Sequence, residues 1–450
     1  MANRSILKAA CLGLIIAAAN MASMCGGDLD ALHDADSGPD GSDTDTDTDS
    51  DSDTDTGTHI KLTGVDLLVV VDNSGSMAEE QAILSTQIFT LLNSFVDPLP
   101  GWPWPAIDDL RVAFVSSDMG LQWGAPAQPP QDGMQRAGCG DFGDNGAFQQ
   151  GAYAPGGSGT ISIQNDTIPC AAGASQCPTG WTCENITSGV GVCRTPGGDG
   201  ANQTCPGVSS TWTETSADAP NATLPFQAAC LSALGTDGCG FEQQLASAAA
   251  GVEKNKATFI RDDALLAVIV VSDEEDCSMQ DGPGIFNSSQ FKGPQINIAC
   301  GENPQFLFEP NTFYSRLRGI KGDHGNALFF GAIVGVPYDP DKPGADGVCQ
   351  GPGDTIAGCL EAPEMQPVVI DEPTGSGGTI PQYKPACTRG PADSVVTKAR
   401  PGRRYVELAT ANPPDGFGAM SYVYSICNAD WNPAMTAMGD RIAKIVHESK

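Results

Sequence analysis

Short apolar runs alternate along the chain with longer segments whose apolar residues recur every three to four positions. Such runs, rich in β-branched residues, are typical of central parallel strands that are covered on both faces. We predict strands in the apolar parts of residues 67–71, 110–117, 264–276, 327–336 and 421–426. Helices are predicted at residues 77–93, 241–256, 311–320, 404–411 and 433–448. This alternation predicts an α/β fold with a doubly wound, mostly parallel central sheet flanked by helices.

A loop of oxygen donors follows the first of these strands. Asp72, Ser74 and Ser76 are spaced two residues apart, so their side chains can point the same way. Ligands bind at the carboxyl ends of parallel strands. One carboxylate with two hydroxyls suits Mg²⁺ or Ca²⁺ better than Zn²⁺. The alternative is that Asp72 and Ser74 only cap the helix that follows.

Two later residues could complete such a site. Asp273 lies just past the apolar run that begins at Ala264, and a neighbouring parallel strand would bring it to the same edge as Asp72. Thr236 lies in the glycine-rich loop 234–240 before a predicted helix and could add a third hydroxyl. The alternative for Thr236 is an ordinary turn at the start of a helix.

In order and context, Asp72, Ser74, Ser76, Thr236 and Asp273 resemble the metal-ion-dependent adhesion site of von Willebrand factor type A (VWA) domains, over roughly residues 63–449. The resemblance implies a doubly wound, Rossmann-like α/β fold with one metal ion at the top of the sheet, Mg²⁺ or else Ca²⁺ or Mn²⁺. It also implies that one coordination position stays open for a Glu or Asp of a protein partner. The expected function is metal-dependent protein binding or adhesion at the cell surface. The alternative is a structural or assembly component of the cell envelope in which the metal only stabilises the fold.

Catalysis is not expected. His33 lies in the acidic segment, His59 at its end and His447 at the end of the last predicted helix, which leaves His324 as the sole candidate, in a segment typical of a turn before a strand. The motifs G-x-S-x-G, H-E-x-x-H and the P-loop are absent from the sequence. The acidic run 273–276 offers paired carboxylates, but we expect it to form a solvated loop that orients the metal. A metal-dependent hydrolase is therefore the least favoured function.

A cysteine-rich segment at about residues 119–233 interrupts the predicted domain. Its cysteines favour a small disulfide-stabilised lobe over a zinc site, because their spacings are irregular and the segment has no histidine. Without Cys11 and Cys25, fourteen of the sixteen cysteines remain, an even number that fits disulfides. The candidates are Cys139, Cys170, Cys177, Cys183, Cys193, Cys205, Cys230, Cys239, Cys277, Cys300, Cys349, Cys359, Cys387 and Cys427. One pairing would join the loops of Thr236 and Asp273, namely Cys239 with Cys277.

The N-terminus predicts export. Arg4 and Lys8 precede an apolar stretch too short to span a membrane, so residues 1–24 are predicted to be a signal peptide. Residues 22–27 resemble the lipobox of bacterial lipoproteins with Cys25 as the lipid anchor, although conventional cleavage is the alternative. The Asp-rich residues 25–58 are predicted to be a disordered tether, and residues 59–450 the VWA domain. We expect an outer-membrane or cell-surface lipoprotein, otherwise a secreted or periplasmic protein.

The charge of the chain narrows the range of partners. The net charge is −32, and about −22 remains for residues 59–450 without the twelve aspartates of the tether and the two basic residues of the signal peptide. Nucleic acid is therefore not expected as a partner, and the membrane is expected to be contacted only through the lipid anchor.

Overall fold

The predicted apolar runs form five neighbouring parallel strands of one six-stranded sheet in the computed structural model. They are β1 (Gly64–Val71), β2 (Leu110–Ser116), β7 (Ala264–Val271), β8 (Leu328–Val334) and β13 (Ser421–Ser425). A short sixth strand, β6 (Trp212–Glu214), pairs antiparallel with β2. The order is β13-β8-β7-β1-β2-β6, which is compatible with a Rossmann-like fold. The prediction of a mostly parallel central sheet flanked by helices is confirmed.

The structure describes residues 61–98, 101–121, 139, 143–149, 169–171, 182–187, 190–194, 211–215, 224–236, 238–286, 296–338, 349–356, 358–374, 377–390 and 397–449. All of them belong to one unit of the chain, residues 57–450. The predicted signal peptide, Cys25 and the acidic tether lie outside the described residues.

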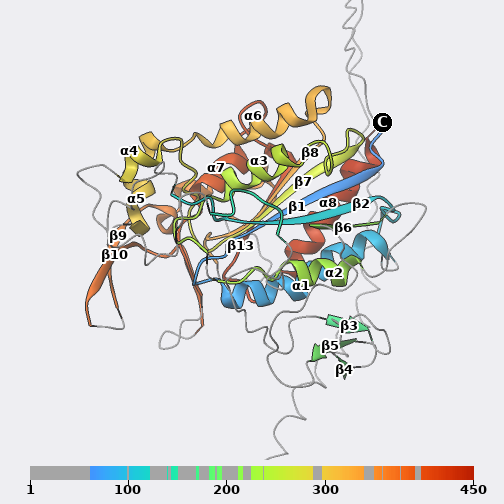
Figure 1. The fold of residues 1–450 in the computed structure, drawn as a ribbon, viewed down its shortest axis with the longest axis horizontal. Helices are drawn as coiled ribbons and strands as arrows, with labels where there is room; N and C mark the ends of the chain where they lie inside the picture. The colour runs from blue at the N-terminus through green and yellow to red at the C-terminus, as the bar shows by residue number, and fades with distance from the viewer. Residues whose placement is uncertain are drawn as a thin grey trace, which may run out of the picture. The chain divides into compact units, whose positions relative to one another are not determined.

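Helices cover both faces of the sheet (Figure 1). On one face lie α1 (Ala78–Val96), α2 (Leu224–Leu231) and α8 (Asn432–Glu448). On the other lie α3 (Gln244–Lys254), α6 (Pro310–Lys321) and α7 (Arg403–Thr410). Alternate residues of a strand point to opposite faces, and in β1 Leu67 and Val69 pack with the first group whereas Leu68 and Val70 pack with the second. Every residue of β1 is buried for this reason, which explains the unbroken apolar run from Leu67 to Val71.

The register of the three central strands aligns their carboxyl ends. Val71 of β1 lies opposite Ser116 of β2 and Val271 of β7. The next residue of each strand, Asp72, Ser117 and Ser272, is therefore at the same level of the sheet. This alignment makes one edge of the sheet polar.

Shorter elements surround this edge. The segment after β7 forms α4 (Gly282–Phe286) and α5 (Ile296–Glu302). The chain between β8 and α7 forms two hairpins, β9 (Val369–Pro373) with β10 (Thr379–Tyr383), and β11 (Cys387–Arg389) with β12 (Thr397–Ala399).

The cysteine-rich segment contributes a separate three-stranded sheet of β3 (Pro169–Ala171), β4 (Thr182–Thr187) and β5 (Val190–Arg194). Its last part supplies β6 and α2 to the main domain.

Four disulfides are formed between described residues. They join Cys139 to Cys239, Cys277 to Cys300, Cys349 to Cys359, and Cys387 to Cys427. Cys230 is disulfide-bonded as well. The considered pairing of Cys239 with Cys277 is therefore wrong. Each of the two cysteines instead fixes its own loop to a different segment.

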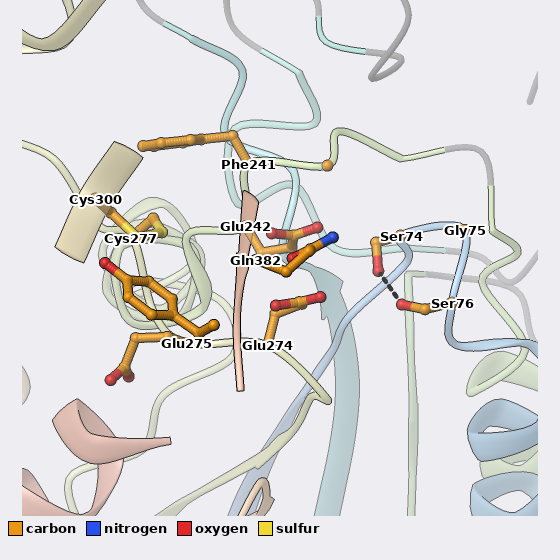
Figure 2. A pocket seen from close by; sticks show the side chains of 12 residues that line it. Ser74, Gly75, Ser76, Phe241, Glu242, Glu274, Glu275, Cys277, Cys300 and Gln382 are labelled. Atoms are coloured by element: carbon orange, nitrogen blue, oxygen red, sulfur yellow. Dashed lines mark hydrogen bonds between the residues drawn. A yellow bond between two sulfur atoms is a disulfide. The ribbon is translucent and has the colours of Figure 1, made fainter. Parts of the chain in front are cut away.

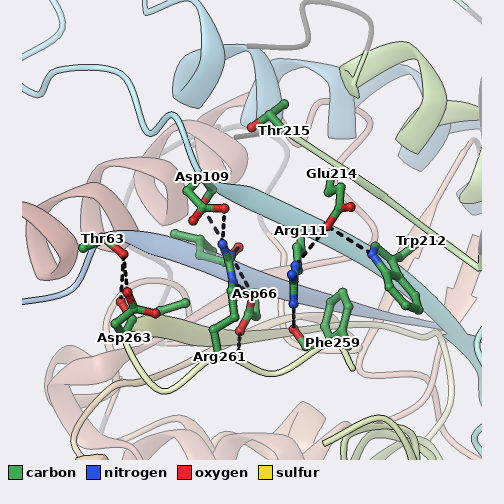
Figure 3. A network of polar contacts seen from close by, with 12 residues as sticks. Thr63, Asp66, Asp109, Arg111, Trp212, Glu214, Thr215, Phe259, Arg261 and Asp263 are labelled. Atoms are coloured by element: carbon green, nitrogen blue, oxygen red, sulfur yellow. Dashed lines mark hydrogen bonds and ion pairs between the residues drawn. The ribbon is translucent and has the colours of Figure 1, made fainter. Parts of the chain in front are cut away.

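A partly buried ion-pair network closes the opposite end of the sheet (Figure 3). Arg261, in the loop before β7, lies 2.7 Å from the carboxylate of Asp66 and also pairs with Asp109. Lys321, which is 2% exposed, donates hydrogen bonds to three backbone carbonyls of the same loop. Together these cations fix the start of β7 against β1 and β2.

No helix among the described residues is both long and apolar enough to cross a membrane.

Candidate functional site at the carboxyl edge of the sheet

Asp72 occupies the centre of the polar edge and is fully buried. Its Oδ2 accepts a hydrogen bond of 2.6 Å from Ser272 Oγ and one of 3.3 Å from Gln244 Nε2. Its Oδ1 accepts one of 2.8 Å from the backbone amide of Ser74 and a longer one of 3.4 Å from Ser117 Oγ. These donors come from four different segments, so the orientation of the Asp72 carboxylate is fixed by its surroundings.

Three of the predicted ligand side chains form a chain in which neighbouring groups lie within hydrogen-bond distance. Ser74 Oγ is 3.2 Å from Ser76 Oγ, and Ser76 Oγ donates to Asp273 Oδ1 at 3.1 Å. Figure 2 shows the two serine hydroxyls turned toward each other. Because Asp273 is 2% exposed and Ser76 is exposed, the group extends from the buried end of the sheet to its surface. The structure thus brings residues 197 positions apart into contact.

The Thr236 loop is held beside this group by Gln81 of α1. Gln81 Oε1 accepts hydrogen bonds from the amides of Leu234 and Gly235, and its Nε2 donates to the carbonyls of Asp72 and Gly235. Thr236 is half-buried, and among the described residues its hydroxyl makes no hydrogen bond to the other four predicted ligands. The structure therefore places the loop next to the site without a hydrogen bond from the Thr236 hydroxyl to the other predicted ligands.

A glycine permits the close approach of this loop to β1. The amide of Gly238 donates to the carbonyl of Asn73 at 2.8 Å. A Cβ atom at Gly238 would lie 2.2 Å from Asn73 Oδ1, which is far inside van der Waals contact. The glycine-rich composition of residues 234–240 therefore has a packing reason here.

The acidic run 273–276 is not the solvated loop that we expected. Asp276 is fully buried and accepts a hydrogen bond from the amide of Leu245 at the start of α3, and its carboxylate lies 3.0 Å from Arg404 Nε. The Glu275 carboxylate accepts hydrogen bonds from the amides of Arg403 and Arg404, in the first turn of α7. Carboxylates at helix N-termini satisfy free amides and favour the helix dipole. Two of the four acidic residues thus anchor helices.

The other two face the polar edge, where negative charge accumulates. Burial raises the pKa of Asp72, and burial together with the charges of Glu274 and Asp72 raises the pKa of Asp273 well above its ordinary value. Burial and the same neighbours raise the pKa of Glu242, in the loop before α3, well above its ordinary value too. Burial also raises the pKa of Glu274 to about 7, against the opposing effect of Arg400. A cation bound among these groups would favour their charged forms.

The donor set fits a hard divalent cation only if the hydroxyls take part. Among the residues that the structure describes, no three His, Cys, Asp or Glu side chains are grouped so that they could hold a metal ion. Ser74 Oγ, Ser76 Oγ and Asp273 Oδ1 are all oxygen donors, the type that Mg²⁺, Ca²⁺ and Mn²⁺ prefer. Asp72 lies behind them and could act through water.

A cavity of about 180 Å³ opens beside the two serines (Figure 2). Glu242 and Glu274 line its middle, and the Cys277–Cys300 disulfide lies at the far side from the serines. The hairpin strand β10 contributes Gln382 to the lining. The cavity is thus continuous with the residues predicted to bind the metal.

Several residues of the site were not predicted from the sequence. Ser117 and Ser272 could have been found, because each lies just past the apolar part of a predicted strand, in the position that corresponds to Asp72. Gln81, Glu242 and Gln382 carried no signal, because each reaches the site through tertiary packing. His324 lies in a 3₁₀ turn, Gly322–His324, before β8, as predicted.

Comparison with protein-family models finds none that matches this chain, and comparison with curated protein sequences finds no match.

Proposed function

We propose that Asp72, Ser74, Ser76 and Asp273 bind one divalent cation, Mg²⁺ or else Ca²⁺ or Mn²⁺, and that this ion binds an acidic residue of a partner protein. The observation that carries the proposal is the contact of the Ser74, Ser76 and Asp273 side chains at the end of β1 and β7. The mostly parallel central sheet is compatible with the Rossmann-like fold that the resemblance implies.

The charges next to the ion support binding of an external carboxylate. Ser74 and Ser76 are neutral, and Asp72 is already engaged by four hydrogen-bond donors. An ion held mainly by hydroxyls and one carboxylate keeps much of its positive charge. A further carboxylate in the remaining coordination position is therefore favourable. In this proposal Thr236 approaches the ion when a ligand is bound, and the role of the site is binding rather than catalysis.

Calorimetric titration of the full chain with Mn²⁺, Mg²⁺ and Ca²⁺ tests the metal site. We expect one ion per chain and at least ten-fold weaker binding in Ser76→Ala. The matched control is Ser315→Ala, because Ser315 is an exposed serine on α6. Equal affinity in Ser76→Ala and Ser315→Ala would refute the assignment of the ion to this edge.

Acetate is a suitable probe of the open coordination position. In the proposed function, acetate binds the Mn²⁺-loaded chain, and Thr236→Ala weakens this binding while the melting temperature stays near that of the wild type. If the metal only stabilises an envelope component, Thr236→Ala should instead lower the melting temperature in the presence of Mn²⁺, because the stabilisation by bound metal is reduced. Acetate binding that is independent of Mn²⁺ would contradict the proposal.

A further inference from the structure

The cavity beside the serines contains acceptor groups that have few hydrogen-bond donors or none among the described residues. Glu242 is 6% exposed, and among the described residues only its own backbone amide acts as a donor to its carboxylate. Gln382 Oε1, which reaches the same cavity from β10, is buried without a hydrogen-bond partner in the described part of the chain. Buried acceptors without donors cost free energy unless a ligand or water supplies the hydrogen bonds. The lining therefore favours a ligand that donates several hydrogen bonds.

The charges around the cavity also lack compensation. Of the buried or half-buried carboxylates of Asp72, Asp273, Glu242 and Glu274, only Glu274 lies within ion-pair distance of a cationic side chain among the described residues, that of Arg400. Arg400 Nε is 3.9 Å from Glu274, and its Nη2 is already paired with Glu372 at 2.9 Å. Glu242 has no cationic side chain within ion-pair distance in the described part of the chain.

The walls of the cavity suit a cation with an apolar stem. Phe241 and the Cys277–Cys300 disulfide form apolar parts of its lining. A volume of about 180 Å³ is below that of ordinary small-molecule sites, which hold ~300–1,000 Å³. It matches a single side chain better than a larger ligand. Lysine and arginine combine an aliphatic stem with a multidonor cationic head.

We propose that this cavity binds an alkylammonium or alkylguanidinium group, supplied by a lysine or arginine of the same partner whose acidic residue binds the metal. The head contacts Glu242, Glu274 and Gln382, and the stem lies against Phe241 and the disulfide. Figure 2 shows Glu242, Glu274 and Gln382 between the serine pair and the disulfide, so the two binding positions share one cavity. The assignment of this lysine or arginine to the same partner rests on the proposed function, whereas binding of a cation in the pocket does not require the metal.

Ethylguanidinium is the probe for the pocket, measured by saturation-transfer NMR on the full chain without and with Mg²⁺. We expect one bound ethylguanidinium, and at least ten-fold weaker binding in Glu242→Gln, which keeps the size of the side chain and removes its charge. Glu253→Gln is the matched control, because Glu253 is an exposed glutamate at the end of α3. Tetramethylammonium, which carries the charge but no donors, should bind at least ten-fold more weakly than ethylguanidinium. A urea midpoint for each variant verifies that it is folded.

The outcomes separate this inference from the metal site. Absence of ethylguanidinium binding, or equal binding to Glu242→Gln and wild type, overturns the cation pocket whatever Mg²⁺ does. Mg²⁺ should weaken ethylguanidinium binding several-fold, to a constant limit, because two cations in one cavity repel each other. If the affinity for ethylguanidinium keeps falling without limit as the Mg²⁺ concentration increases, Mg²⁺ and ethylguanidinium compete for one position, which overturns the inference. Ethylguanidinium binding by a chain that binds none of Mg²⁺, Ca²⁺ and Mn²⁺ would refute the proposed function and leave the pocket in place.

Discussion

Replacing Gln81 by leucine should destabilise the domain and loosen the loop that carries Thr236. Gln81 is 5% exposed and makes four hydrogen bonds, all to backbone groups at the end of β1 or in the loop. The leucine side chain has a similar size but neither donates nor accepts hydrogen bonds. The substitution therefore removes all four bonds while the volume of the side chain changes little.

The magnitude follows from these bonds. A buried hydrogen bond contributes ~1 kcal/mol net, so four of them amount to about 4 kcal/mol. The leucine side chain offsets about 1 kcal/mol through burial of apolar surface. We therefore expect the free energy of unfolding to fall by about 3 kcal/mol. With a urea m value of ~3 kcal/mol/M, the midpoint of unfolding should fall by about 1 M.

Urea denaturation followed by tryptophan fluorescence measures this change, and Mn²⁺ titration of the folded variant measures the effect on the site. Gln280→Leu is the matched control, because Gln280 is exposed and makes one side-chain hydrogen bond, to the carbonyl of Gln305. Its midpoint should change by less than ~0.2 M, as expected for a surface position. If Gln81→Leu unfolds at the same urea concentration as Gln280→Leu, the four hydrogen bonds do not hold the loop.

Three further predictions concern stability. Lys321→Met should lower the free energy of unfolding by about 3 kcal/mol, because three backbone carbonyls lose their donor; the exposed Lys256→Met is the control. Burial raises the pKa of the Asp66 carboxyl above its ordinary value of 3.8. Protonated Asp66 therefore contributes its full share of the stability at pH values below 3.8, and this share is lost as the pH rises through the folded-state pKa. The substituted side chain does not titrate in Asp66→Asn, so the urea midpoint of this variant should rise relative to that of the wild type as the pH increases. Replacing both Cys139 and Cys239 by serine opens a bridge between residues 100 positions apart, and should cost about 4.7 kcal/mol on the chain-entropy model.

Each of these predictions has an outcome that would contradict it. Lys321→Met as stable as Lys256→Met would mean that water satisfies the three carbonyls. Parallel pH profiles for Asp66→Asn and the wild type would show that burial does not control Asp66. A cost below ~1 kcal/mol for the cysteine pair would mean that the unfolded chain is already constrained between these two positions.

The sequence predicted the central strands because their burial leaves a direct pattern. β1, β7 and β8 are covered on both faces, and such strands are continuous apolar runs. The edge strand β6 escaped prediction, because Trp212–Glu214 is only three residues long and its burial alternates. Its place in the main sheet depends on pairing with β2, which no local pattern records.

The candidate site was predictable as far as it follows from strand ends. Asp72 and Asp273 come at or just past the ends of neighbouring strands, so their proximity follows from a parallel sheet. The partner of Cys239 could not be obtained in this way, because cysteine connectivity depends on the path of the loops. Gln382 and Arg400 come from a segment with little regular patterning, and only the packing of its hairpins brings Gln382 to the cavity and Arg400 next to Glu274.

The position of β1 in the sheet affects how the chain folds during synthesis. Val71 pairs with Val271, two hundred positions later, whereas its other neighbour, Ser116, is close in sequence. At ~5–20 residues per second, a ribosome needs about 10–40 s to add those two hundred residues. During that interval one side of an apolar strand has no partner, which is a condition that promotes aggregation. The edge of the sheet that carries Asp72 and Asp273 is therefore completed late, and slow translation or delayed release of the chain would expose β1 for longer.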